Sequence, residues 1–146
     1  MRRTTLLRKQ HDAALVLAQS IIESCDGPAD DFKAFRTSML LAKLTGLLRI
    51  HFAQEDEVLY PRMEASFDAD TSATARKFRN EMGGLSRVYT EFVNRWATSQ
   101  QIASDFAGFK KECQELFTAL TKRIERENAM LYPLADAIDE EIGKTG

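Results

Sequence analysis

Apolar residues recur along this chain at intervals of three and four residues, the spacing that places them on one face of an α-helix. The first such segment predicts a helix from about Thr4 to Cys25, which Asp26-Gly27-Pro28 should end. The second predicts a helix that begins with Asp30 or Asp31 as its cap and runs towards Pro61. Proline lacks an N–H and clashes with the preceding turn, so we expect a kink or an end at Pro61. The apolar face of this second helix includes Phe32, Phe35, Met39, Leu40, Leu47 and Ile50.

The second half of the chain repeats this pattern. A third helix is predicted from about Ser72 to Ala97, and a fourth begins near Ser104 after the connection Thr98–Gln101. The inner face of the third helix is predicted to contain Phe78, Met82, Leu85, Val88, Tyr89, Phe92 and Trp96.

Residues that disfavour helix occur at two further places, near the end of the fourth helix and inside the third helix. After Pro133 we expect a short helical tail from Leu134 to Ile142 and a frayed end over residues 143–146. Gly83-Gly84 lies inside the third helix, where close packing of backbones would explain two unfavourable residues. Four long amphipathic helices with short links predict an all-α fold, an up-down-up-down four-helix bundle with a short C-terminal helical tail. Residues 1–146 are expected to form this single domain.

A histidine and a carboxylate lie one helical turn apart near the end of the second helix. His51 and Glu55 are separated by four residues, so their side chains share one face and one ion could reach both. The same side of the helix is marked as apolar by Leu44, Leu47, Leu48, Val58 and Leu59. We therefore expect His51 and Glu55 to point into the bundle.

The segment 48–61 has a second copy at 120–133. The two overlay at an offset of 72 residues, with identical residues at Leu48/Leu120, Glu55/Glu127, Leu59/Leu131, Tyr60/Tyr132 and Pro61/Pro133. In this register His51 falls on Arg123. The chain is thus a duplicated helical hairpin, with Glu55 and Glu127 as matching carboxylates.

The overall composition indicates which classes of partner and which compartment to expect. The chain has 44% hydrophobic and 29% charged residues and a net charge of −2, which does not favour nucleic acid or an anionic membrane as partner. The apolar run Ala13–Ala18 is shorter than the core of a secretory signal, and no stretch approaches the length of a membrane span. Cys25 and Cys113 form no CxxC motif and are interpreted as reduced thiols. These features predict a cytoplasmic protein.

Taken together, the motifs resemble those of the hemerythrin-like (HHE cation-binding) family. That family has a histidine on the first helix, HxxxE on the second, a histidine on the third and a histidine followed by a carboxylate on the fourth. The Leu-Tyr-Pro after each carboxylate also resembles the family's Leu-Phe/Tyr-Pro. The resemblance implies that the metal ligands are His11, His51, Glu55 and Glu127.

Two expected histidines of the family pattern are replaced. Met82 stands where the third-helix histidine is expected, and Arg123 stands at the fourth-helix histidine. In the family's two-metal sites these two histidines serve the second ion, so the remaining ligands predict a mononuclear site. Two histidines and two carboxylates suit iron, with manganese or zinc as alternatives. Reversible O2 carriage in the family draws an electron from each of two irons, which argues against that role here.

The replaced positions allow more than one interpretation. A guanidinium at Arg123 is always charged and can pair with Glu127 or Glu55, which would replace the second ion; alternatively, Arg123 extends to solvent. Met82 is interpreted as a core residue, since a thioether is a poor ligand for a hard ion. Tyr60 and Tyr132 are interpreted as packing residues, with a redox role beside iron as the alternative.

The leading hypothesis is a hemerythrin-like protein with one non-haem metal ion, used in sensing or handling oxygen, nitric oxide or redox state. The alternative is a metal-free, degenerate bundle that serves as a regulatory protein-interaction module, with a protein as its partner. The sequence contains no Gly-rich phosphate loop, GxSxG elbow or zinc-type cysteine array, and no catalytic residues are assigned. Whether the protein is an enzyme is left open.

Overall fold

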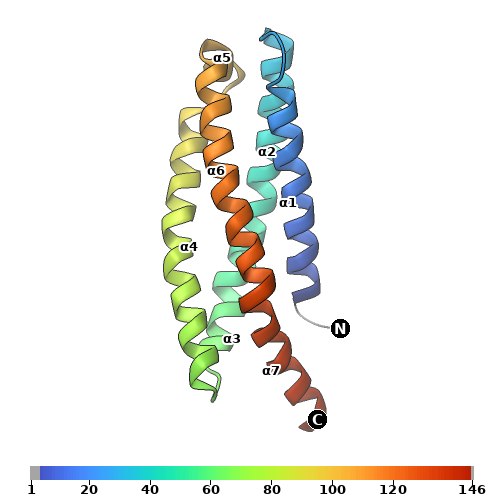
Figure 1. Ribbon diagram of the computed structural model, residues 1–146, viewed down its shortest axis with the longest axis vertical. Coiled ribbons are helices and arrows are strands. Elements are labelled where there is room, and N and C mark those ends of the chain that lie inside the picture. The colour runs from blue at the N-terminus through green and yellow to red at the C-terminus, as the bar shows by residue number, and fades with distance from the viewer. Residues whose placement is uncertain (1–3, 146) are drawn as a thin grey trace.

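The computed structural model describes the backbone of residues 4–145 and the side chains of residues 4–140. Four long helices run alternately up and down side by side, as the sequence predicts (Figure 1). They are α1 (Thr4–Ser24), α2 (Asp31–Gln54), α4 (Ala69–Arg95) and α6 (Phe106–Arg126). The all-α four-helix bundle is thereby confirmed. None of the helices in the described part of the chain combines the length and apolar character that crossing a membrane requires.

The helix ends differ from the sequence-based bounds, and capping side chains explain the differences at α5 and α6. Helix α4 begins at Ala69, three residues before the predicted start. The predicted connection at residues 98–101 instead opens the short helix α5 (Ser99–Ser104), because Thr98 and Gln101 form a reciprocal capping box. Asp105 then caps α6 by accepting a hydrogen bond from the Gly108 N–H.

Two π-helical turns interrupt the long helices at equivalent places. Helix α2 continues through η1 (Glu55–Leu59) into α3 (Tyr60–Glu64), and α6 continues through η2 (Glu127–Leu131) into α7 (Tyr132–Thr145). In each turn the tyrosine N–H donates to the carbonyl of the glutamate five residues earlier. Of the two outcomes expected at Pro61, an end of the helix is wrong, because the backbone changes hydrogen-bond register before the proline and α3 continues to Glu64. The kink stays a prediction. The C-terminal segment expected to be frayed is helical as far as Thr145, and Gly146 lies outside the described residues.

The buried apolar residues form two clusters, one towards each end of the bundle. The larger packs α1, α2, α4, α5 and α6 around Ile21, Leu44, Phe92, Phe109 and Phe117. The smaller packs α3, α4, α7 and the start of α1 around Leu7, Met63, Phe78 and Leu131. Polar residues of the centre described below lie along the helices between these two clusters.

Several apolar residues predicted on inner faces are exposed. On α2, Phe32 is 76% exposed, and Phe35, Met39 and Ile50 are also exposed; Val58 on η1 and Val88 on α4 are too. Helix α2 has apolar residues on more than one side, and the stripe through Ala34, Leu41, Leu44 and Leu48 is the one that packs inward. The predicted close packing at Gly83-Gly84 is also wrong, because no described atom outside the local helix lies within 4 Å of a Cβ built on either glycine.

Candidate metal centre

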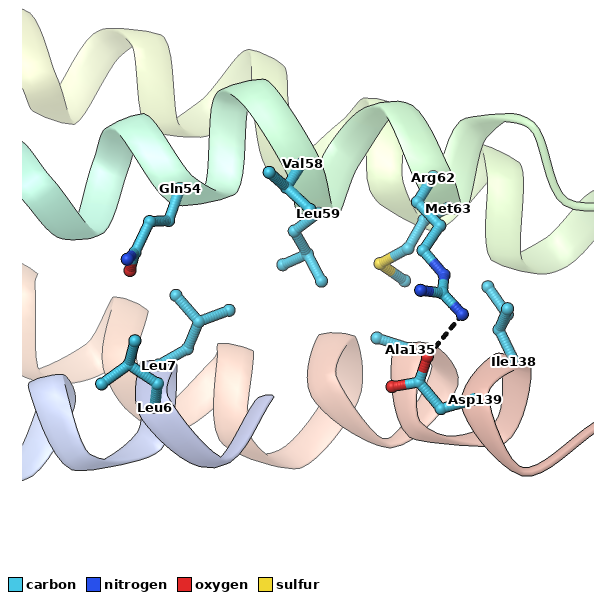
Figure 2. A pocket seen from close by; sticks show the side chains of 10 residues that line it. All are labelled: Leu6, Leu7, Gln54, Val58, Leu59, Arg62, Met63, Ala135, Ile138 and Asp139. Atoms are coloured by element: carbon cyan, nitrogen blue, oxygen red, sulfur yellow. Dashed lines mark ion pairs between the residues drawn. The ribbon is translucent and has the colours of Figure 1, made fainter. Parts of the chain in front are cut away.

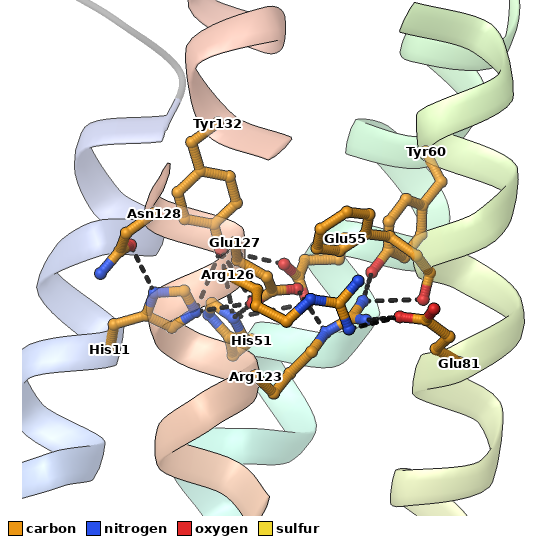
Figure 3. A network of polar contacts seen from close by, with 11 residues as sticks. His11, His51, Glu55, Tyr60, Glu81, Arg123, Arg126, Glu127, Asn128 and Tyr132 are labelled. Carbon is orange, nitrogen blue, oxygen red and sulfur yellow. Dashed lines mark hydrogen bonds and ion pairs between the residues drawn. The ribbon is translucent and has the colours of Figure 1, made fainter. Parts of the chain in front are cut away.

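Four side chains from three long helical segments meet in the middle of the bundle. His11 comes from α1, His51 from the last turn of α2, and Glu55 and Glu127 are the first residues of η1 and η2. Each is at most 2% exposed. One donor atom from each lies within 4.8 Å of those of the other three (Figure 3). The structure therefore brings together all four residues that the sequence singles out as ligands.

The two histidines turn the same ring nitrogen towards the carboxylates. His11 Nε2 lies 2.8 Å from Glu127 Oε1, and His51 Nε2 lies 3.4 Å from Glu55 Oε1 and 3.8 Å from Glu127 Oε1. Glu55 Oε1 is buried and makes no hydrogen bond within the described residues. Such an oxygen is costly to bury unless something compensates it. Two imidazole nitrogens and carboxylate oxygens at this spacing suit a divalent iron, manganese or zinc ion.

The second ring nitrogen of each imidazole, Nδ1, points away from the carboxylates and forms a hydrogen bond with an amide side chain. His11 Nδ1 lies 2.8 Å from Asn128 Oδ1, and His51 Nδ1 lies 2.7 Å from Gln10 Oε1. An amide oxygen can only accept, so each Nδ1 carries the proton and a neutral ring leaves Nε2 available to a metal ion. This is the usual arrangement of metal-binding histidines. Gln10 and Asn128 directly neighbour His11 and Glu127 in sequence, but no sequence pattern marked them.

The hydrogen bonds continue from His51 to an apolar cavity. Gln10 Nε2 donates to Gln54 Oε1 at 2.9 Å, and Gln54 lies in the wall of a cavity of about 240 Å³ (Figure 2). Leu7 and Leu59 line this cavity, each one turn along the chain from a residue of the centre. The Arg62–Asp139 ion pair lies at its other end (Figure 2). A polar path thus joins the cavity to the outer side of His51.

The two repeat-related tyrosines are more than packing residues. The Tyr132 hydroxyl donates to Glu55 Oε2 at 2.9 Å and lies 3.1 Å from His11 Nε2. The Tyr60 hydroxyl accepts a hydrogen bond from Arg123 Nη2 at 2.9 Å. Burial and the neighbouring carboxylates raise the pKa of both phenols, so each remains protonated and available to donate. The packing interpretation therefore needs correction: the rings are buried, but the hydroxyls belong to the polar network.

Arg123 points into the bundle, which rules out the interpretation that it extends to solvent. It is 6% exposed, and its Nε donates to Glu127 Oε2 at 3.3 Å. Its Nη2 donates to the Phe78 carbonyl at 2.7 Å, and its Nη1 lies 3.5 Å from Glu81 Oε2. The guanidinium also lies over the Phe78 ring at 4.6 Å. Met82 is buried, in agreement with its interpretation as a core residue.

The buried charges shift the protonation of the centre. Burial raises the pKa of Glu55 to about 7, although the neighbouring His51 acts to lower it. Burial opposes ionisation of Glu127 as well, but the hydrogen bond with His11, the neighbouring His51 and the charge of Arg123 hold its pKa well below the ordinary value. Burial alone would lower the pKa of His51, but the neighbouring carboxylates of Glu127 and Glu55 outweigh this effect and raise the pKa to about 9. Without a metal ion the centre therefore holds protons that an ion would displace.

Comparison with known families agrees with the fold. The model of the hemerythrin HHE cation-binding domain matches residues 2–135, nearly the whole chain. The chain therefore belongs to the hemerythrin HHE family, and the resemblance seen in its motifs is confirmed. Searches of curated proteins and of solved structures give no significant match to this chain.

Proposed function

We propose that this domain binds a single metal ion, most suitably iron, through His11, His51, Glu55 and Glu127. The observation that carries the proposal is the convergence of four buried donor groups within 4.8 Å, in a family of cation-binding domains. The protonated outer nitrogens and the unsatisfied Glu55 Oε1 support it, since both suit an ion placed between the four groups. Manganese and zinc are the alternative ions.

We further propose that the bound metal serves in sensing or handling oxygen, nitric oxide or redox state. Bound iron would supply a redox-active centre that can bind these small molecules. The chain itself supplies the enclosure: the four ligating side chains are almost fully buried, which restricts access by water. Tyr132 supplies a hydroxyl that lies among the four groups, 2.9 Å from Glu55 Oε2, 3.1 Å from His11 Nε2, 3.4 Å from His51 Nε2 and 3.5 Å from Glu127 Oε1. We assign the protein to the cytoplasm on the sequence features given above.

A second function is favoured by the protein contacts that Glu127 makes without an ion. Arg123 neutralises Glu127, and both Arg123 and His11 lie within hydrogen-bond distance of it, so protein groups alone stabilise this carboxylate. A bundle of this kind can serve as a metal-free interaction module with a protein partner. The two functions differ in one measurable property, which is the metal content.

Metal analysis of protein purified without chelator and then loaded anaerobically with Fe(II) tests the proposal. About one iron per chain supports metal binding, and none in any preparation supports the metal-free module. The variant His51→Ala is expected to lose the ion. The matched control Met82→Leu alters a buried side chain that we exclude from the ligands, and it should keep the wild-type stoichiometry. Equal loss in both variants would show that the ligand assignment is wrong.

A further inference from the structure

The internal repeat defines two equivalent positions in the centre, and they carry different chemistry. The π-turns η1 and η2 begin at Glu55 and Glu127, which are 72 residues apart, and each is followed by a tyrosine at the same register. Four residues before each glutamate stand His51 and Arg123. Each of these two residues contacts the glutamate four positions later: His51 Nε2 lies 3.4 Å from Glu55, and Arg123 Nε lies 3.3 Å from Glu127. Arg123 is therefore the repeat partner of an imidazole that faces the ion position.

The carboxylate of Glu127 connects the two positions. Its Oε1 faces His11 at 2.8 Å, while its Oε2 faces the Arg123 guanidinium at 3.3 Å (Figure 3). One carboxylate thus has an oxygen on the imidazole side and an oxygen on the guanidinium side. Beyond the guanidinium, the Tyr60 hydroxyl lies 2.9 Å from Arg123 Nη2, whereas its repeat partner Tyr132 contacts Glu55.

The charge balance favours one ion and one guanidinium. Two carboxylates lie in the buried centre, and a buried charge requires a partner. A divalent ion beside His11 and His51 can interact with both carboxylates, and the permanent charge of Arg123 already neutralises the far oxygen of Glu127. A second divalent ion there would lie against the guanidinium, and like charges at such distances repel strongly in a buried site.

We propose that Arg123 is a built-in cation that takes the second of two repeat-related ion positions and so limits the centre to one metal ion. This inference rests on the proposed function, because it concerns the number of ions at the same site. It identifies Arg123 as the residue that sets the metal stoichiometry.

Metal counting in Arg123 variants tests the proposal. Wild type and each variant are loaded anaerobically with Fe(II), and separately with Zn(II), then desalted and analysed for metal per chain, with circular dichroism to verify helix content. The double variant Met82→His with Arg123→His is expected to rise from one ion to two, because two neutral imidazoles replace the guanidinium and a thioether. Arg123→His alone should rise less. Arg123→Lys keeps the positive charge and adds no imidazole ligand, so this variant is expected to stay at one ion per chain.

Arg126→His is the matched control. Arg126 also lies over the Phe78 ring, at 4.8 Å, and pairs with Glu81 at 2.7 Å, but it is 40% exposed. It should keep one ion per chain. A wild type that binds two ions, a folded double variant that stays at one, or an equal gain in Arg126→His would overturn the role of Arg123 while metal binding stands. A wild type that takes up no ion overturns the proposed function itself.

Discussion

At the end of α2 an imidazole faces a glutamate one turn further on, and at the end of α6 a guanidinium faces its repeat-related glutamate in the same way. Both segments then enter a π-turn at that glutamate and continue with Tyr-Pro. The backbone framework has thus been retained in both halves, whereas the charge presented to the centre differs. An imidazole can lose its proton and bind a metal ion, but a guanidinium keeps its charge and only donates hydrogen bonds. Under the proposed role of Arg123, the residue at this position decides whether that half of the centre binds an ion or supplies a fixed cation in its place.

The largest effect is expected from removing the permanent cation. In metal-free protein, Arg123→Ala leaves Glu127 Oε2 and the Tyr60 hydroxyl without their buried donor. Breaking a buried ion pair in this way typically costs about 3–5 kcal/mol of unfolding free energy. The measurement is urea unfolding of chelator-treated protein at pH 7. Arg126→Ala, in the exposed arginine of the same network, should cost no more than about 1 kcal/mol; similar losses in both variants would contradict the buried role of Arg123.

The stability that His51 contributes should depend on pH between 6.5 and 9, whereas the stability that Arg123 contributes should not, because a guanidinium keeps its charge over this range. The pKa of His51 is raised to about 9, so its contribution to the stability of the metal-free protein is complete below pH 6.5 and is lost as pH rises to 9. A shift of this size corresponds to about 3 kcal/mol. Glu55, with its pKa raised to about 7, acts in the same direction but mostly below this range. Urea unfolding at pH 6.5 and pH 9 measures the loss, and the variant His51→Gln should flatten it. An unchanged slope in that variant would assign the titration to another group.

How far the sequence alone predicts this comparison can be traced through particular residues. Helical periodicity predicts the bundle, and the repeat predicts that Glu55 and Glu127 meet, because both depend on regular spacing. The π-turns were not predicted, since a change of one residue in hydrogen-bond register leaves the apolar pattern almost intact. The exposure of Phe32 was missed because α2 is apolar on two sides and only packing selects one.

The supporting residues of the centre escaped prediction for a related reason. Gln10 and Asn128 are amides on helices, and most such residues face solvent. Only the packing of α1 against α2 and η2 shows that the Gln10 oxygen reaches His51 and the Asn128 oxygen reaches His11. Tyr132 is interpreted from sequence as a packing residue, with a redox role as the alternative, because the sequence does not show that its hydroxyl reaches Glu55.

The next largest effect is expected on metal affinity, from removing the hydrogen bond between Gln10 and His51 Nδ1. Gln10→Leu removes the acceptor of the His51 Nδ1 proton and the link to Gln54. Loss of such a partner typically weakens metal binding about 10–100-fold. Competition titration with a coloured chelator measures the affinity for Zn(II). The control is Gln19→Leu, an exposed glutamine on the same helix that pairs with Glu23. Equal affinity in wild type and Gln10→Leu would mean that Gln10 does not orient His51.

The smallest effect is expected from replacing helical glycines, one in each half of the chain. These variants test whether the two halves differ at positions away from the centre. Gly46 on α2 and Gly83 on α4 both lie within helices, and among the described residues a Cβ at either would meet no atom within 4 Å outside its own helical turn. Replacing glycine by alanine in such a position restricts the unfolded chain and favours the helix by up to about 1 kcal/mol. Gly46→Ala and Gly83→Ala should therefore raise the unfolding free energy by similar amounts and leave the metal content unchanged, as measured by urea unfolding and metal analysis. A destabilised Gly83→Ala beside a stabilised Gly46→Ala would show that α4 carries a packing constraint next to Met82. The difference between the two halves would then extend beyond the residues that face the centre, and Arg123 alone would no longer account for it.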